Sequence, residues 1–181
     1  LRIIHINHNL NEYSDDWAQF SSEICEKYGL SFIYASVKPK RQGQGLEADA
    51  RELRYQSFRE VIQDDEYLLT GHHQDDQMET LLYRIFRGTG IDGLRAIRRE
   101  TKFGKGFLYR PMLNVSREEI EEYAQLRNLK WIHDSSNDDS SYDRNFLRKD
   151  IIPSIKKRWP SVEKKVSRLS VIADQNQSLL N

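Results

Sequence analysis

The residues of this sequence best suited to chemistry are a run of histidines and carboxylates between positions 70 and 80. The run reads Thr70-Gly71-His72-His73-Gln74-Asp75-Asp76-Gln77-Met78-Glu79-Thr80. On a helix, His72, Asp76 and Glu79 fall on one face, and Asp75 precedes Glu79 by four residues and can share its edge. Carboxylates packed this closely repel one another unless a cation or a hydrogen-bond donor compensates them. Because Mg²⁺ binds one or two carboxylates together with phosphate oxygens, the pattern indicates a magnesium and phosphate site at Asp75, Asp76 and Glu79.

The flanking residues predict that this run is a strand-to-helix turn. Tyr67-Leu68-Leu69 is a short apolar segment typical of a buried strand. Apolar residues at helical spacing follow, until Arg87-Gly88-Thr89-Gly90 stops the helix. In an open parallel sheet this turn lies at the carboxyl end of a strand, where ligands bind, and a helix N-terminus there attracts anions.

A plainer interpretation of the same residues stays open. Asp75 and Asp76 can be first-turn acids that favour the helix dipole, with Glu79 solvated. A D-D-x-x-E pattern alone favours the two interpretations about equally, because such charges are common on solvated helices. The two histidines at the strand end and the glycine-rich stop favour function.

Composition narrows the class of protein. The 181 residues carry 28 basic and 28 acidic side chains, so net charge indicates no partner. Residues 84–110 and 144–168 nevertheless hold eight and nine Lys or Arg, which predicts a polyanion on one face; solvated helix faces are the alternative. The single cysteine, Cys25, excludes an intrachain disulfide and favours a reducing, cytoplasmic location. No apolar run approaches the ~18 residues of a membrane span.

The order of the expected elements predicts the fold class. Strands are expected at 1–6, 31–35 and 67–69, and helices at 14–28, 46–62 and 78–86. This alternation predicts an α/β fold: a Rossmann-like parallel sheet with helices on both faces. Tyr67–Thr70 would be central in the sheet, and Leu1–Ile6 would lie beside a strand that precedes Leu1.

Downstream, a hairpin is expected around 97–109, a capping box at Ser116–Glu119, and a last helix after Ser161. Residues 1–152 would form the nucleotide-binding domain and 153–181 a linker helix.

Taken together, the motifs resemble those of the N-type PP-loop ATPases and, within them, the tRNA(Ile)-lysidine synthetase family. The matching segments run nearly from end to end: His5–Leu10, Ala50–Tyr55, Gly71–Thr80, Arg87–Leu94, Arg110–Leu113, Asp134–Asn137 and Arg144-Asn145. The resemblance implies a bacterial, ATP- and Mg²⁺-dependent ligase that joins free lysine to C2 of the wobble cytidine of tRNA(Ile) with the CAU anticodon. The reaction passes through an adenylated cytidine, and the product, lysidine, switches codon reading from AUG to AUA. Oligomeric state stays open, with a homodimer as one arrangement.

The resemblance also implies roles for individual residues. Asp76, His72 and Arg51 would be catalytic. The nucleotide would be bound by His5, Asn7, His72, Gly88 and Gly90. Lysine or tRNA would be bound by Arg87, Asp134, Asn137, Arg144 and Asn145. Spacing alone favours simpler roles: a surface charge for Arg51, a helix stop for the glycines and a polar capping loop for residues 134–145.

One motif of the family is missing from the 181 residues: the phosphate loop S-G-G-x-D-S. The resemblance therefore leads us to expect this loop before Leu1 and tRNA-binding domains after Asn181, and to expect no lysidine from the bare chain. Three alternatives stay open: a tRNA thiolase, an amidating relative such as GMP synthetase, and a non-catalytic RNA-binding module. Thiolation is disfavoured because such enzymes typically need paired cysteines.

Overall fold

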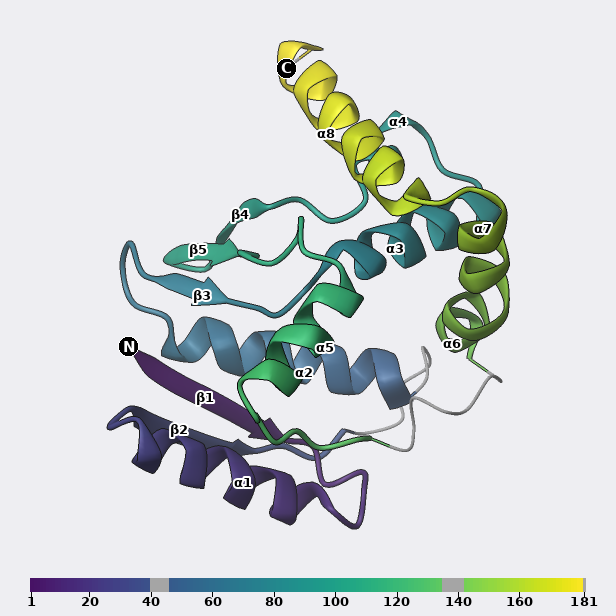
Figure 1. Ribbon diagram of the computed structural model, residues 1–181. Helices are drawn as coiled ribbons and strands as arrows, with labels where there is room; N and C mark the ends of the chain where they lie inside the picture. Colours follow the sequence, from purple (N-terminus) through teal and green to yellow (C-terminus); the bar gives the residue numbers. More distant parts are fainter. Residues whose placement is uncertain (40–45, 135–141, 181) are drawn as a thin grey trace. The chain divides into compact units, whose positions relative to one another are not determined.

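The computed structural model (Figure 1) describes residues 1–39, 46–134 and 142–180. The chain falls into two compact units. The first unit contains Leu1–Leu68 and Lys102–Phe107. The second contains Leu69–Thr101 and Leu108–Asn181.

The first unit is built on two parallel strands. Strand β1 (Arg2–Asn7) pairs with β2 (Ser31–Ser36), with helix α1 (Ser14–Lys27) between them in the chain. Side chains alternate between the faces of a strand, so Arg2 and His5 point to opposite faces. Arg2 bonds the carbonyl of Val61, at the end of helix α2 (Leu46–Val61), whereas His5 lies 3.4 Å from Ser21 of α1. Helices therefore cover both faces of this parallel pair, as the α/β prediction expects (Figure 1).

A second sheet has the order β3-β5-β4. It consists of β3 (Tyr67–Leu69), β4 (Glu100–Phe103) and β5 (Gly106–Tyr109). The backbone carbonyl of Glu66 accepts a hydrogen bond from the N–H of Phe107, and the N–H of Thr70 donates to the backbone carbonyl of Tyr109. These bonds show that β3 runs parallel to β5. The expected hairpin is confirmed, since β4 and β5 are hydrogen-bonded neighbours, and its second strand also pairs with β3.

The expectation that 1–6 and 67–70 share one sheet is wrong for the described residues. Strand β1 pairs with β2, β3 pairs with β5, and no described strand bonds to both β1 and β3. A sheet extends only where backbone groups pair directly or through an intervening strand. The sequence indicated the hairpin but held no signal for the strand with which it would pair.

The second unit is largely helical and packs around α3. Its helices are α3 (Gln74–Phe86), α4 (Ile91–Leu94), α5 (Arg117–Leu126), α6 (Asp143–Phe146), the π-helical turn η2 (Leu147–Ile151), α7 (Ile152–Arg158) and α8 (Val162–Leu180). Met78 and Leu81 of α3 are almost fully buried, as are Leu147 of η2 and Ala173 of α8. Burial of each large apolar side chain contributes about 1.5–3 kcal/mol. The predicted capping box of α5 is confirmed, since Ser116 and Glu119 exchange hydrogen bonds.

Helix α8 is the longest helix described, and it packs against α3 and α4. Arg95, which follows α4, forms an ion pair with Asp174 of α8. The predicted boundary between residues 152 and 153 stays a prediction. Among the residues that the structure describes, no helix, α8 included, is long and apolar enough to cross a membrane.

Replacing Gly106 with alanine should lower the free energy of unfolding by about 3 kcal/mol, because the site has no room for a methyl group. A Cβ there would lie 2.1 Å from the backbone oxygen of Glu66 and 2.9 Å from Cδ1 of Ile62. Urea denaturation followed by circular dichroism measures the loss. Gly71→Ala is the matched control, since its Cβ would meet only Met112, at an ordinary 3.5 Å. Equal stability of the two variants would contradict the close approach of the backbone at Gly106.

Candidate functional site

The predicted strand-to-helix turn is present in the second unit. Helix α3 begins at Gln74, and its N-cap residue is His73. The N–H of His73 donates to Oδ2 of Asp76 at 2.8 Å, which fixes this carboxylate against the first turn. Nδ1 of His72 lies 2.9 Å from the hydroxyl oxygen of Thr70. His72 and Asp76 therefore both lie at the N-terminal end of α3, as the sequence predicts.

Glu79 lies one turn further along α3 and is not solvated. The residue is 3% exposed, and both carboxylate oxygens accept hydrogen bonds from Arg148 of η2, at 2.6 and 2.8 Å. This two-point contact raises the pKa of Arg148 above its ordinary value, although burial acts against it. Nη2 of Arg148 also lies 4.0 Å from Oδ1 of Asp76. A single guanidinium thus serves both carboxylates of this face.

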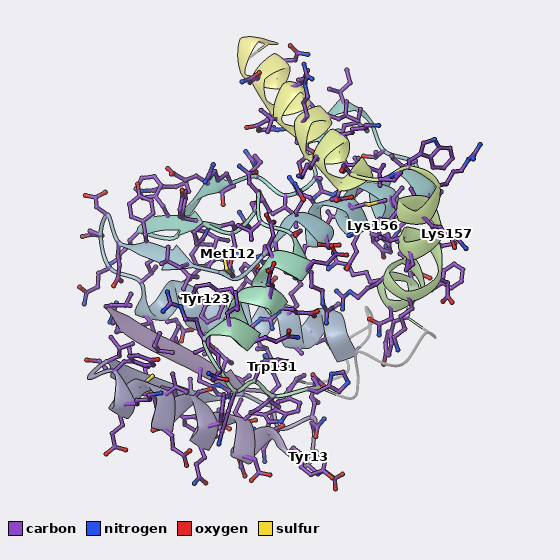
Figure 2. All side chains as sticks on the ribbon, in the orientation of Figure 1. Tyr13, Met112, Tyr123, Trp131, Lys156 and Lys157 are labelled. Atoms are coloured by element: carbon purple, nitrogen blue, oxygen red, sulfur yellow. The ribbon has the colours of Figure 1, made fainter. Side chains whose placement is uncertain are left out.

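Asp75 is likewise buried and has its own cation. Its carboxylate accepts hydrogen bonds from the ammonium group of Lys156 and from the N–H of Arg117, the latter at 2.9 Å. Lys156 lies on the side of α7 toward α3, whereas the neighbouring Lys157 points away (Figure 2). Burial by itself raises the pKa of Asp75, but the two hydrogen bonds outweigh it, and the pKa falls below its ordinary value. For Lys156, burial lowers the pKa, and the bond to Asp75 more than compensates.

These shifts predict how stability changes with pH. The lowered pKa of Asp75 gives stability that is present above its unfolded value of 3.8 and is lost as pH falls through the folded value. The raised pKa of Lys156 gives stability that is present below 10.5 and is lost as pH rises through the folded value. Asp75→Asn should therefore be less stable than the unaltered protein at neutral pH. Urea midpoints measured from pH 3 to 11 should show the difference shrinking at both ends of the range; a constant difference would contradict the pairing.

Asp76 is the carboxylate of the three that keeps capacity for a further ligand. Its side chain is 21% exposed, one oxygen accepts from the helix cap, and the other lies 4.0 Å from Arg148. Beside it, Nδ1 of His73 and Oε1 of Gln74 are buried and have no hydrogen-bond partner among the described residues. In the part of the chain that the structure describes, no three His, Cys, Asp or Glu side chains are grouped to hold a metal ion. This arrangement fits a magnesium ion bound through one carboxylate and completed by water and phosphate better than the predicted set of Asp75, Asp76 and Glu79.

At the other end of α3, Tyr83 brings together two residues predicted for substrate binding. The guanidinium of Arg87 lies 5.2 Å from the centre of the Tyr83 ring and that of Arg144 lies 5.7 Å from it. Arg87 also donates to the Tyr83 hydroxyl. Sequence reasoning missed Tyr83, although its spacing of four residues from Arg87 was a usable signal. Tyr83 therefore holds two guanidinium groups within one small region.

The remaining predicted residues of this unit are less informative. Gly88 follows α3 with a φ of +72°, a left-handed conformation that favours glycine, and Gly90 is the N-cap residue of α4. Asp134 and Asn145 are half-buried, and Asn137 lies outside the described residues. Their roles in binding stay predictions.

In the first unit, His5 and Asn7 lie at the carboxyl end of β1, as predicted. Asn7 is 2% exposed and donates to Asp15 at 2.8 Å and to the hydroxyl of Tyr34 at 3.1 Å. It also accepts from the N–H of Asn9, so it shapes the turn that leaves the strand. The ring of His5 stacks on Tyr34, and burial lowers the pKa of His5. A neutral His5 at neutral pH is suited to packing or hydrogen bonding rather than to charge neutralisation.

Arg51 lies on an exposed part of α2. Its guanidinium is 5.0 Å from the centre of the Tyr55 ring, one turn along the helix. That contact agrees with the surface role that spacing favours, and the catalytic role of Arg51 stays a prediction.

Several Lys and Arg side chains of residues 84–110 and 144–168 form ion pairs and hydrogen bonds within the second unit. Arg148, Lys156 and Arg95 form ion pairs with Glu79, Asp75 and Asp174. Arg84 donates to the carbonyl of Ala96, and Arg110 to that of Arg98. These cations hold the second unit together, and the expectation of a polyanion must rest on the others.

The fold and the site define a class: α/β proteins that present a carboxylate and a helix N-terminus at a strand-to-helix turn. The family described as "PP-loop domain" matches residues 1–155, and the chain belongs to this family. It is similar to three bacterial proteins named tRNA(Ile)-lysidine synthase. That of Histophilus somni (strain 129Pt) is 41% identical over 100% of this chain and 42% of its own length, and that of Proteus mirabilis (strain HI4320) is 40% identical over 100% and 41%. That of Pseudomonas syringae pv. tomato is 39% identical over 100% and 40%. The chain spans about two fifths of the length of these relatives.

A solved structure supports the fold. The chain is similar to the U34-tRNA thiolase NcsA from Methanococcus maripaludis with its [4Fe-4S] cluster, with a TM-score of 0.69 at 16% identity. The match covers 94% of this chain and 60% of the thiolase chain. At this identity the likeness concerns the fold alone. It agrees with the predicted α/β class.

Proposed function

We propose that the protein is an ATP-dependent ligase that joins lysine to C2 of the wobble cytidine of tRNA(Ile) with the CAU anticodon. The observation that carries this proposal is the match of the whole chain, at about 40% identity, to relatives named tRNA(Ile)-lysidine synthase. The product would be lysidine, and codon reading would change from AUG to AUA. The chemistry belongs to the cytoplasm, where ATP, tRNA and free lysine are present together.

ATP, when bound with Mg²⁺, supplies the adenylyl group that activates the C2 carbonyl of the cytidine. The N-terminal end of α3 is suited to receive phosphate, because its backbone N–H groups and dipole favour negative charge. In the proposal Asp76 binds the magnesium ion, and His72 donates to a phosphate oxygen. For Arg51, in the first unit, the proposal rests on the resemblance: its guanidinium would stabilise charge that develops during the reaction. His5, Asn7, Gly88 and Gly90 would line the adenosine and phosphate sites.

The lysine amine then displaces AMP from the base. Arg87 and Arg144, held by Tyr83, are suited to an anionic group, either a tRNA phosphate or the carboxylate of lysine. Asp134, Asn137 and Asn145 are proposed for the ammonium groups of lysine or the edge of the cytidine.

The test measures AMP release by the protein expressed at its natural full length, with transcribed tRNA, lysine and ATP. AMP should form only when lysine and a tRNA with a wobble cytidine are both present, and mass spectrometry should find lysine added to that base. The same tRNA with uridine at the wobble position is the control. AMP formation that does not require lysine would contradict the proposal and favour another PP-loop reaction. A thiolase is disfavoured because the single cysteine, Cys25, is buried.

A further inference from the structure

Arg148 occupies an unusual position among the carboxylates of α3. Its Nε and Nη2 donate hydrogen bonds to Glu79, at 2.6 and 2.8 Å, so each oxygen of that carboxylate accepts one hydrogen bond from Arg148. The same Nη2 is 4.0 Å from Asp76, too far for a hydrogen bond. Arg148 therefore engages Glu79 fully and Asp76 only through space.

The backbone conformation around Arg148 fixes the point from which its side chain extends. Arg148 lies in η2, a single π-helical turn, and such turns are rare and often occur at functional sites. Leu147, the preceding residue, is 4% exposed and anchors the turn in the core of the unit. The guanidinium is thereby presented to α3 from a fixed point of the chain.

Glu79 and Asp76 are three residues apart on α3 and face the same side. If Glu79 were free, the two carboxylates could bind one cation together. Additional carboxylates raise the affinity of an oxygen site for divalent cations, and flexible, charge-rich sites favour the larger Ca²⁺ and Mn²⁺ over Mg²⁺. The guanidinium of Arg148 matches the geometry of a carboxylate. Its two hydrogen bonds therefore keep Glu79 from binding a cation.

We propose that Arg148 is a positioning residue that keeps Glu79 away from the metal ion and leaves Asp76 as the carboxylate that binds it. This inference rests on the magnesium–ATP site of the proposed function. Lys156 acts in the same sense on Asp75, the third carboxylate of the cluster. The metal consequently stays weakly bound until nucleotide phosphates complete its coordination.

The test measures Mn²⁺ binding without nucleotide, by the loss of the free-ion electron paramagnetic resonance signal, on the full-length protein. Arg148→Met should bind Mn²⁺ at least about fivefold more tightly than the unaltered protein, because Glu79 becomes available. Adding Glu79→Gln to that variant should return the affinity to the unaltered value. Arg95→Met is the matched control: it breaks another ion pair of the second unit, with Asp174, and should leave Mn²⁺ affinity unchanged.

Unchanged Mn²⁺ affinity in folded Arg148→Met would overturn the inference. If that variant does not fold, Arg148→Lys replaces it, since lysine keeps the charge but loses the two-point fork. Its Mn²⁺ affinity should lie above that of the unaltered protein, and an unchanged value would again overturn the inference. The result is independent of lysidine formation: failure of the AMP assay in the unaltered protein concerns the proposed function, and failure of the Mn²⁺ assay concerns Arg148.

Discussion

Replacing Asp76 with alanine should lower the rate of pyrophosphate release from ATP by at least about 10²–10³-fold, while tRNA binding stays nearly unchanged. The reason is that a metal-binding carboxylate acts mainly on the transferring phosphate, where charge changes in the transition state. Residues that bind tRNA through its phosphates elsewhere are not affected. Pyrophosphate release and filter binding, measured on the same preparation of full-length protein, test both halves of this prediction.

Asp76→Asn is the matched control for this experiment. The alanine variant also loses the bond from the N–H of His73, which is worth about 1 kcal/mol. Asparagine keeps an acceptor for that bond and removes only the charge. Both variants should be inactive, and only the alanine variant should be measurably less stable. Undiminished pyrophosphate release by Asp76→Asn would show that Asp76 serves only the helix terminus.

Replacing Glu79 with alanine should lower the free energy of unfolding by about 3–5 kcal/mol, because Arg148 loses both of its hydrogen bonds and its partly buried charge keeps only the 4.0 Å contact with Asp76. For a domain of this size, the melting temperature should fall by about 6–20 °C. Thermal unfolding followed by circular dichroism measures the effect. A loss as small as that of an exposed pair would mean that the Arg148–Glu79 contact is not formed in solution.

Two further variants define the scale of that effect. Glu121→Ala removes the exposed, same-helix partner of Arg117 and should change stability by less than about 1 kcal/mol. Arg148→Met combined with Glu79→Gln removes both charges of the buried pair and should recover much of the stability lost in Glu79→Ala.

The turn around which the site is built could be predicted from sequence because its signals are local. The apolar segment before Thr70, the histidine and acidic first turn, and the glycine stop at Gly88 each act over a few residues. The capping box at Ser116 is of the same kind. Local patterns of this type report hydrogen bonds between neighbours in the chain, and such bonds form wherever the segment is placed.

The partners of the carboxylates could not be predicted in this way. Arg148 and Lys156 are 69 and 81 residues from Glu79 and Asp75, and no periodicity links them. The sequence therefore placed both in a basic segment expected to face a polyanion. The pairing of β5 with β3 is a similar case, because the choice of neighbouring strand depends on the whole fold.

The distance between these pairs along the chain also affects how the protein is made. Synthesis runs from the N-terminus, so α3 emerges from the ribosome well before η2 and α7. Until Arg148 and Lys156 have been added, Glu79 and Asp75 lack the cations that pair with them in the folded protein. During that interval α3 lacks two of the contacts that hold it against η2 and α7. The nascent chain thus acquires its final carboxylate arrangement only after residue 156 has left the exit tunnel.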